Sequence, residues 1–389
     1  MLTSENPFLC GGSQSREVQP WSRTQEGCKQ KVVLAKRKIA KRRGGRPCRF
    51  LFLSIPVSTG ALQLIRSLRA RMFALPALLT FLAAQGSPRL PFGPWHRVSD
   101  TPVIAPRGNG WEAAGTFNPA VAVRGDKIVM LYRAQDKQGT SRLGYAESRD
   151  GIHFNRRDEP VLSPTEEYEK DGGVEDPRLV QFGETYYLTY TGYNKKDAQL
   201  GLATSKDLIH WNRKGVIIPA YKGNWNVKWT KSGAIVPQKI QGKYWMYFLG
   251  TTADNKDQAG LASSTDLLHW TEATQNPVLP VRPDRFDSRV AEPGPAPIVT
   301  PEGIVLIYNG ADDKLVYRTG IAIFDRNDPR KLLWRSDEPV FWPEKDWEKI
   351  GQVPNVVFVE GMLQRGDRYL FYYGGADTNV GIAQATVNH

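Results

Sequence analysis

Hydrophobic and polar positions alternate in short runs from about residue 94 to the end of the chain, and the runs repeat. Each copy has an apolar strand, a glycine-containing turn, a second strand that ends in tyrosine, and a third strand with a Gly-apolar-Ala pattern. A fourth strand follows a Ser-x-Asp turn. The tyrosines of the second strand, spaced by 58, 57, 61 and 65 residues, are Tyr132, Tyr190, Tyr247, Tyr308 and Tyr373. Short alternating runs of this kind predict β-strands rather than helices.

The third strand of each copy shows the same repeat through its glycine. Its glycines, spaced by 57, 59, 60 and 61 residues, are Gly144, Gly201, Gly260, Gly320 and Gly381. Five copies of about four strands each predict an all-β fold, a five-bladed β-propeller. The fifth copy ends without a fourth strand, whereas residues 95–106 carry the matching pattern. We therefore expect this N-terminal strand to close the last blade by pairing with the strand around Val380–Val387, which removes an exposed sheet edge.

Charge divides the chain at Met72. Residues 1–71 hold 15 basic and 3 acidic residues and so carry all of the net charge of +12, whereas the remaining 318 residues hold 37 of each sign. A nucleic-acid-binding domain carries its basic charge on the folded part, so we expect no nucleic-acid partner. We interpret residues 1–71 as a basic arm that is disordered or lies upstream of the true start. The alternative is a nuclear or nucleic-acid patch at residues 36–49, which contain eight Lys or Arg.

Residues 72–90 have the plan of a secretory signal peptide. Two arginines precede an apolar run, Phe73–Ala84, which is followed by small residues. If translation starts at Met72, this segment is N-terminal, and export to the periplasm or the exterior is expected. The alternative is a buried apolar segment of an additional N-terminal domain. No run reaches the roughly 18 apolar residues that a membrane-spanning helix needs. The propeller is predicted to cover residues 91–389.

The innermost strand of each propeller blade lines the central channel, so polar residues at the starts of these strands should converge. The five starts are Phe117–Ala120, Glu175–Arg178, Thr230–Ala234, Ala291–Pro295 and Pro354–Val356. They bring carboxylates, a lysine and two asparagines to one place, where unpaired buried charge destabilises a fold. This ring therefore indicates a functional site. The alternative is a structural ion pair of Arg178 with Asp176 or Glu175 that closes the channel.

Paired carboxylates suit the cleavage of a glycosidic bond, because one acid protonates the leaving oxygen and a base activates water. Asp176 and Glu292 belong to blades two and four and should face each other across the channel. This arrangement favours the separation of ~6.5–9.5 Å that is typical of inverting enzymes. No histidine lies at a strand start, and no phosphate-binding loop or metal-ligand spacing is present, so the sequence predicts neither a cofactor nor a metal.

The motifs at the strand starts resemble those of glycoside hydrolase family 130, which contains β-mannoside phosphorylases and β-1,2-mannosidases on five-bladed propellers. The resemblance covers about residues 115–385. It rests on Phe117–Val121, Leu131–Ala134, Gly173–Arg178, Lys231–Ala234, Gly294–Ile298 and Tyr372–Asp377. It implies that Asn118, Arg133 and Asp377 hold the glycone sugar. It also implies that Asp176 is the catalytic acid, acting through a sugar hydroxyl in the phosphorylases, and that Lys231 lies near the reacting centre.

Two departures from the family pattern bear on the reaction. Phosphorylases of the family carry Tyr-His-Gly where this chain has Asn309 in the middle position, and a small residue where it has Glu292. Phosphate binding needs cationic or donor groups, whereas hydrolysis needs a carboxylate to deprotonate water. The sequence therefore favours an inverting hydrolase of β-mannosides, most plausibly of β-1,2-linked mannose at a non-reducing end.

Other roles and reactions stay open. A phosphorylase that releases mannose 1-phosphate and a non-catalytic sugar-binding propeller are the alternatives. Glu292 could instead bind a substrate hydroxyl, with Glu175 the next candidate for the base. Arg178 and Asn309 complete the predicted substrate-binding residues. The expected partner is a mannoside or oligosaccharide, and the sequence does not predict an oligomeric state.

Overall fold

The computed structural model describes residues 88–388 of the chain, and these residues form an all-β structure. The predicted basic arm and all but the last three residues of the signal-peptide-like segment lie outside the described residues, so the interpretations of both remain predictions. Helical structure in the described part is limited to a 3₁₀ turn, η1 (Glu167–Glu169), and a four-residue helix, α2 (Asp346–Lys349). No helix within residues 88–388 is long and apolar enough to cross a membrane.

The strands form five consecutive antiparallel units. Unit 1 consists of β2 (Gly115–Arg124), β3 (Lys127–Gln135), β4 (Ser141–Ser148) and β5 (Asn155–Arg156). Unit 2 consists of β6 (Gly173–Phe182), β7 (Thr185–Tyr193), β8 (Ala198–Ser205) and β9 (Asn212–Ile218). Unit 3 consists of β10 (Thr230–Ile235), β11 (Tyr244–Thr251), β12 (Asp257–Ser264) and β13 (Thr271–Glu272).

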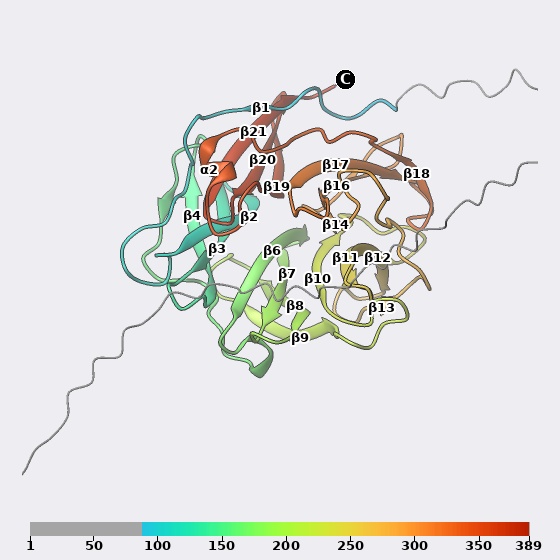
Figure 1. Cartoon of the computed structure of the whole chain (residues 1–389), viewed down its shortest axis with the longest axis horizontal. Coiled ribbons are helices and arrows are strands. Elements are labelled where there is room, and N and C mark those ends of the chain that lie inside the picture. Colours follow the sequence, from blue (N-terminus) through green and yellow to red (C-terminus); the bar gives the residue numbers. More distant parts are fainter. Residues whose placement is uncertain (1–87, 389) are drawn as a thin grey trace, which may run out of the picture. The chain divides into compact units, whose positions relative to one another are not determined.

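The last two units follow the same order with small variations. Unit 4 consists of β14 (Val290–Pro293), β15 (Ile298–Val299), β16 (Ile304–Ala311), β17 (Tyr317–Phe324) and β18 (Leu332–Arg335). Unit 5 consists of β19 (Val357–Arg365), β20 (Arg368–Gly375), β21 (Asn379–Thr386) and the N-terminal strand β1 (His96–Arg97). In Figure 1 the first strand of every unit, β2, β6, β10, β14 or β19, lies nearest the centre of the molecule. Side chains at the beginnings of these strands therefore approach one another.

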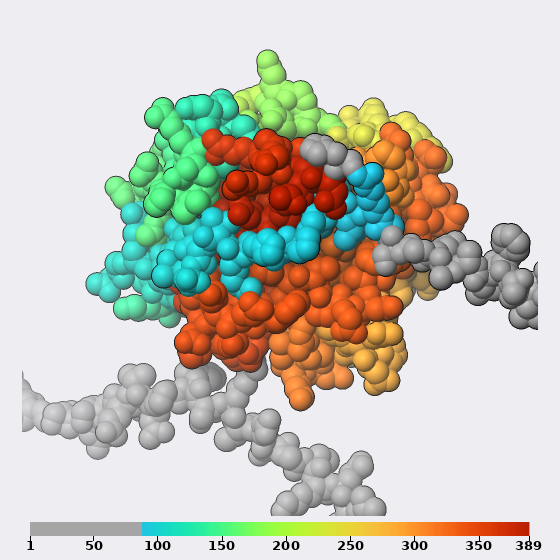
Figure 2. Space-filling model, turned by 90° about the horizontal axis from the view of Figure 1, so that it is seen from above, coloured from blue at the N-terminus to red at the C-terminus, as the bar shows by residue number. Residues whose placement is uncertain are grey.

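The N-terminal strand completes the last unit, as the sequence predicts. β1 pairs antiparallel with β21 through His96 opposite Gln384 and Arg97 opposite Ala383. Two isolated bridges, Phe92 to Val387 and Ile104 to Val380, extend this contact on either side. Figure 2 shows the first described residues running across the C-terminal strands. The free edge of β21 is thereby covered, which protects it from pairing with another chain.

The register of two units differs from the sequence prediction. In each unit a residue of the second strand pairs with the repeated glycine of the third strand. In unit 2 this pair is Tyr190 and Gly201, whereas in unit 3 it is Phe248 and Gly260. Tyr247 therefore points to the other side of its strand, where its hydroxyl donates to the carbonyl oxygen of Pro329. In unit 5 the first strand begins at Val357, after the predicted start at Pro354–Val356. The alignment of Tyr247 with the other tyrosines was wrong, since a strand shifted by one residue presents its opposite face, whereas the start of the fifth strand differs by a single residue.

A repeated cluster, which we call the carboxylate clamp, holds four of the five units. In each, a buried carboxylate just before the first strand accepts a hydrogen bond from the tyrosine of the second strand and forms an ion pair with an arginine of the outermost strand. In unit 2, Glu169 accepts from Tyr190 at 2.8 Å and from Arg213 at 2.9 Å. The four clamps are Glu112–Tyr132–Arg156, Glu169–Tyr190–Arg213, Asp287–Tyr308–Arg335 and Glu348–Tyr373–Arg97. Because each carboxylate is at most 3% exposed, these partners replace the water that it loses on folding.

Unit 3 lacks the clamp at all three positions. Phe248 replaces the tyrosine, and Glu272 replaces the arginine, since it lies opposite Ala262 as Arg156 lies opposite Ala146 in unit 1. Asn226 replaces the carboxylate and packs against Gly250, as Asp287 packs against Gly310 in unit 4. Both polar atoms of Asn226 and one carboxylate oxygen of Glu272 are buried without a hydrogen-bond partner. The chain segment before β10 therefore lacks the side-chain bonds that hold the four corresponding segments.

Removing the charge of one clamp should destabilise the fold. Glu348→Gln removes the buried anion of Arg97, whose side chain is 11% exposed, and leaves only the half-exposed Glu344 carboxylate beside its guanidinium. We expect a loss of about 3 kcal/mol in the free energy of unfolding, measured by urea denaturation with tryptophan fluorescence. The matched control is Glu272→Gln, whose buried oxygen has no partner to lose and which should change the stability by less than about 1 kcal/mol. Equal effects of the two substitutions would contradict a stabilising role for the clamp.

Candidate active site

Four of the central strands, β2, β6, β10 and β19, bulge at the same place, and in the first three a polar residue with left-handed backbone is turned out of the regular register. The register shifts lie between Phe117 and Pro119 in β2, between Glu175 and Arg178 in β6, and between Lys231 and Ala234 in β10. The residues within the bulges, Asn118, Asp176 and Ser232, have φ angles of 46°, 48° and 61°. Left-handed backbone is uncommon for residues other than glycine, and bulges of this kind re-aim side chains beside active sites.

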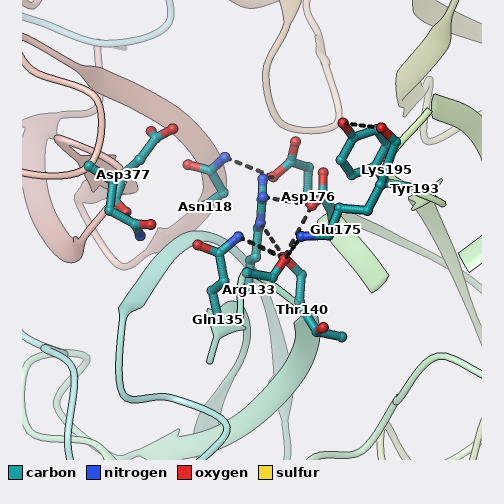
Figure 3. Close-up of polar contacts among 12 residues, drawn as sticks. Asn118, Arg133, Gln135, Thr140, Glu175, Asp176, Tyr193, Lys195 and Asp377 are labelled. Atoms are coloured by element: carbon teal, nitrogen blue, oxygen red, sulfur yellow. Dashed lines mark hydrogen bonds and ion pairs between the residues drawn. The ribbon is translucent and has the colours of Figure 1, made fainter. Parts of the chain in front are cut away.

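Arg133 of β3 joins the polar residues of units 1 and 2. Its two terminal nitrogens donate to Asp176 at 3.1 Å and to Glu175 at 2.7 Å. Asn118 donates its amide to the same oxygen of Asp176 at 2.8 Å, and the Ser141 hydroxyl donates to Glu175 at 3.1 Å. Figure 3 shows this network, with the guanidinium of Arg133 facing both carboxylates. The structure thus brings together four of the predicted site residues from two units.

Units 3 and 4 contribute a second group of charges. Glu292 of β14 is 1% exposed, and its carboxylate accepts a hydrogen bond from the Ser232 hydroxyl. The Lys231 ammonium lies 3.6 Å from the same carboxylate, and the lysine side chain remains 23% exposed. Burial tends to lower the pKa of Lys231, but the neighbouring Glu292 and Asp257 carboxylates raise it above its ordinary value. Lys231 is therefore a charged group that a ligand can reach.

The side chains of Arg178 and Asn309 bind other groups of the protein. Arg178, 2% exposed, donates to the carbonyl oxygens of Gly294 and Pro293 and forms a 3.0 Å ion pair with Glu360. The structural ion pair considered for Arg178 thus exists, but with Glu360 in place of Asp176 or Glu175. Asn309 both donates to and accepts from the backbone of Val359, at 3.0 and 2.9 Å. As placed, both side chains join strands, and their roles in binding substrate remain predictions.

Glu360 is a buried site residue that the sequence analysis missed. It lies in a bulge of β19, between Val359 and Gly361, and is 2% exposed. A single acidic residue in the apolar run VFVEGM was the available signal. The prediction instead used Asn355, which precedes the strand and whose backbone oxygen accepts a hydrogen bond from the Tyr317 amide.

The carboxylates of the site have shifted pKa values. Burial raises the pKa of Glu175 to about 7, although Arg133 opposes the shift. Burial also acts on Asp176, but the nearby Arg133 and Lys231 outweigh it, so the pKa of Asp176 is lowered. Burial likewise raises the pKa of Asp377 to about 6. Before substrate binds, the adjacent pair thus holds a proton on Glu175 rather than on Asp176 at mildly acidic pH.

The site contains more anionic than cationic groups. Within the described residues it gathers five carboxylates, Glu175, Asp176, Glu292, Glu360 and Asp377, and three cations, Arg133, Arg178 and Lys231. Burial raises the pKa of Glu292 and of Glu360 too, because too few cations are available to neutralise all five carboxylates. A mixture of protonated and ionised carboxyl groups provides both donors and acceptors for hydroxyl groups and can move a proton between them.

The raised pKa of Glu175 predicts how stability depends on pH. In the folded protein this group keeps its proton up to about pH 7, whereas an unfolded glutamate loses it near pH 4.5. The folded state therefore binds more protons in this interval, and the stabilisation that Glu175 provides at low pH is lost as pH rises from about 4.5 to 7. We expect Glu175→Gln to gain stability relative to wild type across this interval, measured by urea unfolding at pH 5, 6, 7 and 8. A difference that does not change with pH would contradict the raised pKa.

Comparisons with known proteins identify the family to which the chain belongs. The family model described as β-1,4-mannooligosaccharide phosphorylase, of glycoside hydrolase family 130, matches residues 97–389. The 1,2-β-oligomannan phosphorylase of Thermoanaerobacter sp. (strain X514) is 41% identical over 298 residues, 74% of this chain and 95% of the relative. The β-1,2-mannobiose phosphorylase of the same organism is 34% identical, again over 74% of this chain and 95% of the relative.

A solved structure gives the same result. It is described by the statement that the GH130 family of mannoside phosphorylases contains glycoside hydrolases that target β-1,2 mannosidic linkages in Candida mannan. It matches with a TM-score of 0.70 and 37% identity, over 78% of this chain and 98% of that structure. With the family model covering three quarters of the sequence, the resemblance seen in the strand-start motifs is confirmed: the chain belongs to glycoside hydrolase family 130, a family of enzymes that act on mannosides.

Proposed function

We propose that the chain is a β-1,2-mannoside phosphorylase built on a five-bladed β-propeller. The observation that carries the proposal is the 41% identity to a 1,2-β-oligomannan phosphorylase over 95% of that protein's length. The curated relatives that match are phosphorylases, which favours phosphorolysis over the hydrolysis that the sequence motifs alone favoured. The linkage is inferred from three relatives that are 34–41% identical, whose names specify β-1,2-linked mannose.

The five antiparallel units support the propeller part of the proposal. Each has its first strand at the centre of Figure 1, and single parallel bridges join β4 to β6 and β12 to β14. The last unit is completed by a strand from the N-terminal side of the described chain, which is how a propeller joins its first and last blades.

The geometry suggests how the reaction would proceed. Asn118, Arg133 and Asp377 offer donors and acceptors for the hydroxyl groups of a terminal mannose. The bond from the anomeric carbon to the leaving oxygen would break on the side of Asp176, where a sugar hydroxyl can relay a proton to that oxygen. Binding a sugar over Asp176 removes water from the carboxyl group and raises its pKa, which favours the proton-carrying form. A phosphate oxygen would form the new bond to carbon, held by the partly exposed Lys231.

Hydrolysis with inversion is the second candidate, and Glu292 is the observation that favours it. This carboxylate is buried beside Lys231 and opposite the unit that carries Asp176, so it could deprotonate a water molecule. The excess of carboxylates in the site also opposes the binding of a phosphate dianion. The solved structure from work on hydrolases of the family, at 37% identity, is consistent with either reaction.

The products distinguish the two reactions. With β-1,2-mannobiose and inorganic phosphate, we expect mannose 1-phosphate and mannose in equal amounts, and no cleavage when phosphate is omitted. Anion-exchange chromatography separates and quantifies these products. Free mannose as the sole product, at a rate independent of phosphate, would replace the proposal with hydrolysis. In that case Glu292→Gln should abolish cleavage, and added azide should partly restore it by taking the place of water.

Asp176 should be required for turnover whichever nucleophile is used. Asp176→Asn keeps the shape of the side chain but cannot supply or relay a proton, so we expect kcat to fall by about 10²–10⁴-fold on β-1,2-mannobiose. The matched control is Asp158→Asn, because the Asp158 side chain is 95% exposed on the outside of the molecule. Near-normal turnover by the Asp176 variant, with an unchanged unfolding midpoint, would show that Asp176 only organises Arg133 and Asn118.

A further inference from the structure

The segment before β10 lacks the carboxylate clamp that precedes the first strand of the other four units. In those units the carboxylate of the clamp binds the segment that leads into β2, β6, β14 or β19 to an arginine of the outermost strand. In unit 3 the corresponding Asn226 has no polar partner. The segment is closed instead by backbone hydrogen bonds, from the Tyr221 amide to the Lys228 oxygen at 2.8 Å and from the Lys228 amide to the Thr251 oxygen at 3.1 Å. A local departure from an otherwise repeated pattern is expected where a segment serves function.

The same segment presents aromatic side chains. Tyr221 is 54% exposed and adopts a φ angle of 64°, which is unusual for a bulky residue, while its hydroxyl donates to Asp197 at 2.6 Å. Trp229 is half-buried, and its ring meets the ring of Tyr193 edge-on at a centroid distance of 6.0 Å. Residues held in strained backbone cluster at active sites and ligand clamps. We call Tyr193, Tyr221 and Trp229 the aromatic wall.

The aromatic wall borders the proposed site. Tyr193 ends the strand β7 that pairs with β6, and its pKa is raised by burial and by the neighbouring Glu175 carboxylate. Trp229 lies two residues before Lys231. In Figure 3, Tyr193 and Glu175 lie on one side of Asp176, and Asn118 and Asp377 lie on the other. A mannose held by Asn118 and Asp377, with its glycosidic oxygen at Asp176, would therefore direct the second sugar toward Tyr193.

We propose that the aromatic wall binds the sugar ring of the leaving group, with Trp229 as the main specificity-determining residue. Aromatic rings suit this role because the C–H face of a pyranose packs on them while its hydroxyl groups stay hydrogen-bonded at the edge. The partner of this surface is therefore a pyranose joined to the mannose that is cleaved off. The proposal rests on the mannoside-cleaving function but not on the choice between phosphate and water as the nucleophile.

The test compares two substrates with the same mannose and different leaving groups. β-1,2-Mannobiose has a sugar leaving group that reaches the wall, whereas β-mannosyl fluoride has a single atom that does not. Trp229→Ala should lower kcat/KM on the disaccharide by about tenfold or more and leave kcat/KM on the fluoride within about twofold of wild type. Trp342→Ala, which removes a 46% exposed tryptophan from an outer cavity lined by Pro94 and Trp95, should leave both substrates unaffected.

Other outcomes of this test would overturn either the role of the aromatic wall or the mannoside-cleaving function. Equal losses on both substrates, or no loss on either, would overturn the assignment of the wall. If wild type cleaves neither substrate, the mannoside-cleaving function itself is wrong, which the unmodified protein alone reveals. If Trp229→Ala does not fold, Tyr221→Ser serves instead, since its exposed ring contributes little to the core; it should raise KM for the disaccharide several-fold and leave the fluoride unchanged.

Discussion

The neutralisation of buried carboxylates by guanidinium groups is the interaction on which this structure depends. Four units are each held by a carboxylate that binds a tyrosine hydroxyl and an arginine from the outermost strand, so the innermost and outermost parts of a unit are joined through one buried anion. One of these arginines, Arg97, belongs to the N-terminal strand, and the same interaction therefore joins the two ends of the described chain. At the centre of the molecule the balance is different. Arg133 is shared by two carboxylates, Arg178 is committed to Glu360, and the excess negative charge is expressed as raised pKa values. Opposite charges are thus matched in the clamps and unmatched at the centre of the molecule.

Backbone geometry explains why the central charges meet at all. A regular strand would send neighbouring side chains to opposite faces, whereas the bulges in β2, β6 and β10 turn Asn118, Asp176 and Ser232 out of this alternation. Each of the three residues accepts a left-handed φ angle, a strain that the surrounding antiparallel pairing must hold in place. Asp176 is presented to Asn118 and Arg133 by this distortion, and Ser232 to Glu292. The arrangement of the candidate site is consequently a property of several strands together and not of any single loop.

Much of this could be predicted from the sequence because the repeat carries it. The spacing of the glycines predicts the third strands, and the missing fourth strand of the last copy predicts the pairing of β1 with β21. The strand-start motifs predict that Asn118 and Asp176 meet, since residues at equivalent positions of a repeat converge, and the family resemblance adds Arg133. What the pattern could not give is register within one residue. Phe248 was missed in favour of Tyr247 because both are aromatic, and Glu360 was missed because residues 354–356 were predicted to start the fifth central strand. The internal bonds of Arg178 and Asn309 depend on strands from other units, which no local pattern reveals.

The pairing of β1 with β21 also constrains the order in which the protein can be made. His96 and its partner Gln384 are separated by nearly the whole described chain, so on the ribosome the N-terminal strand emerges long before the strand that it must join. The first four units contain only neighbouring segments and can form during synthesis, but the last unit cannot be completed until the residues around Gln384 have left the exit tunnel. The entropic penalty of closing so long a loop grows only slowly with its length, whereas the delay grows with every residue translated. Until then Phe92, which meets Tyr369 and Phe371 edge-on in the finished molecule, and Trp95, which stacks on Phe371, lack these partners.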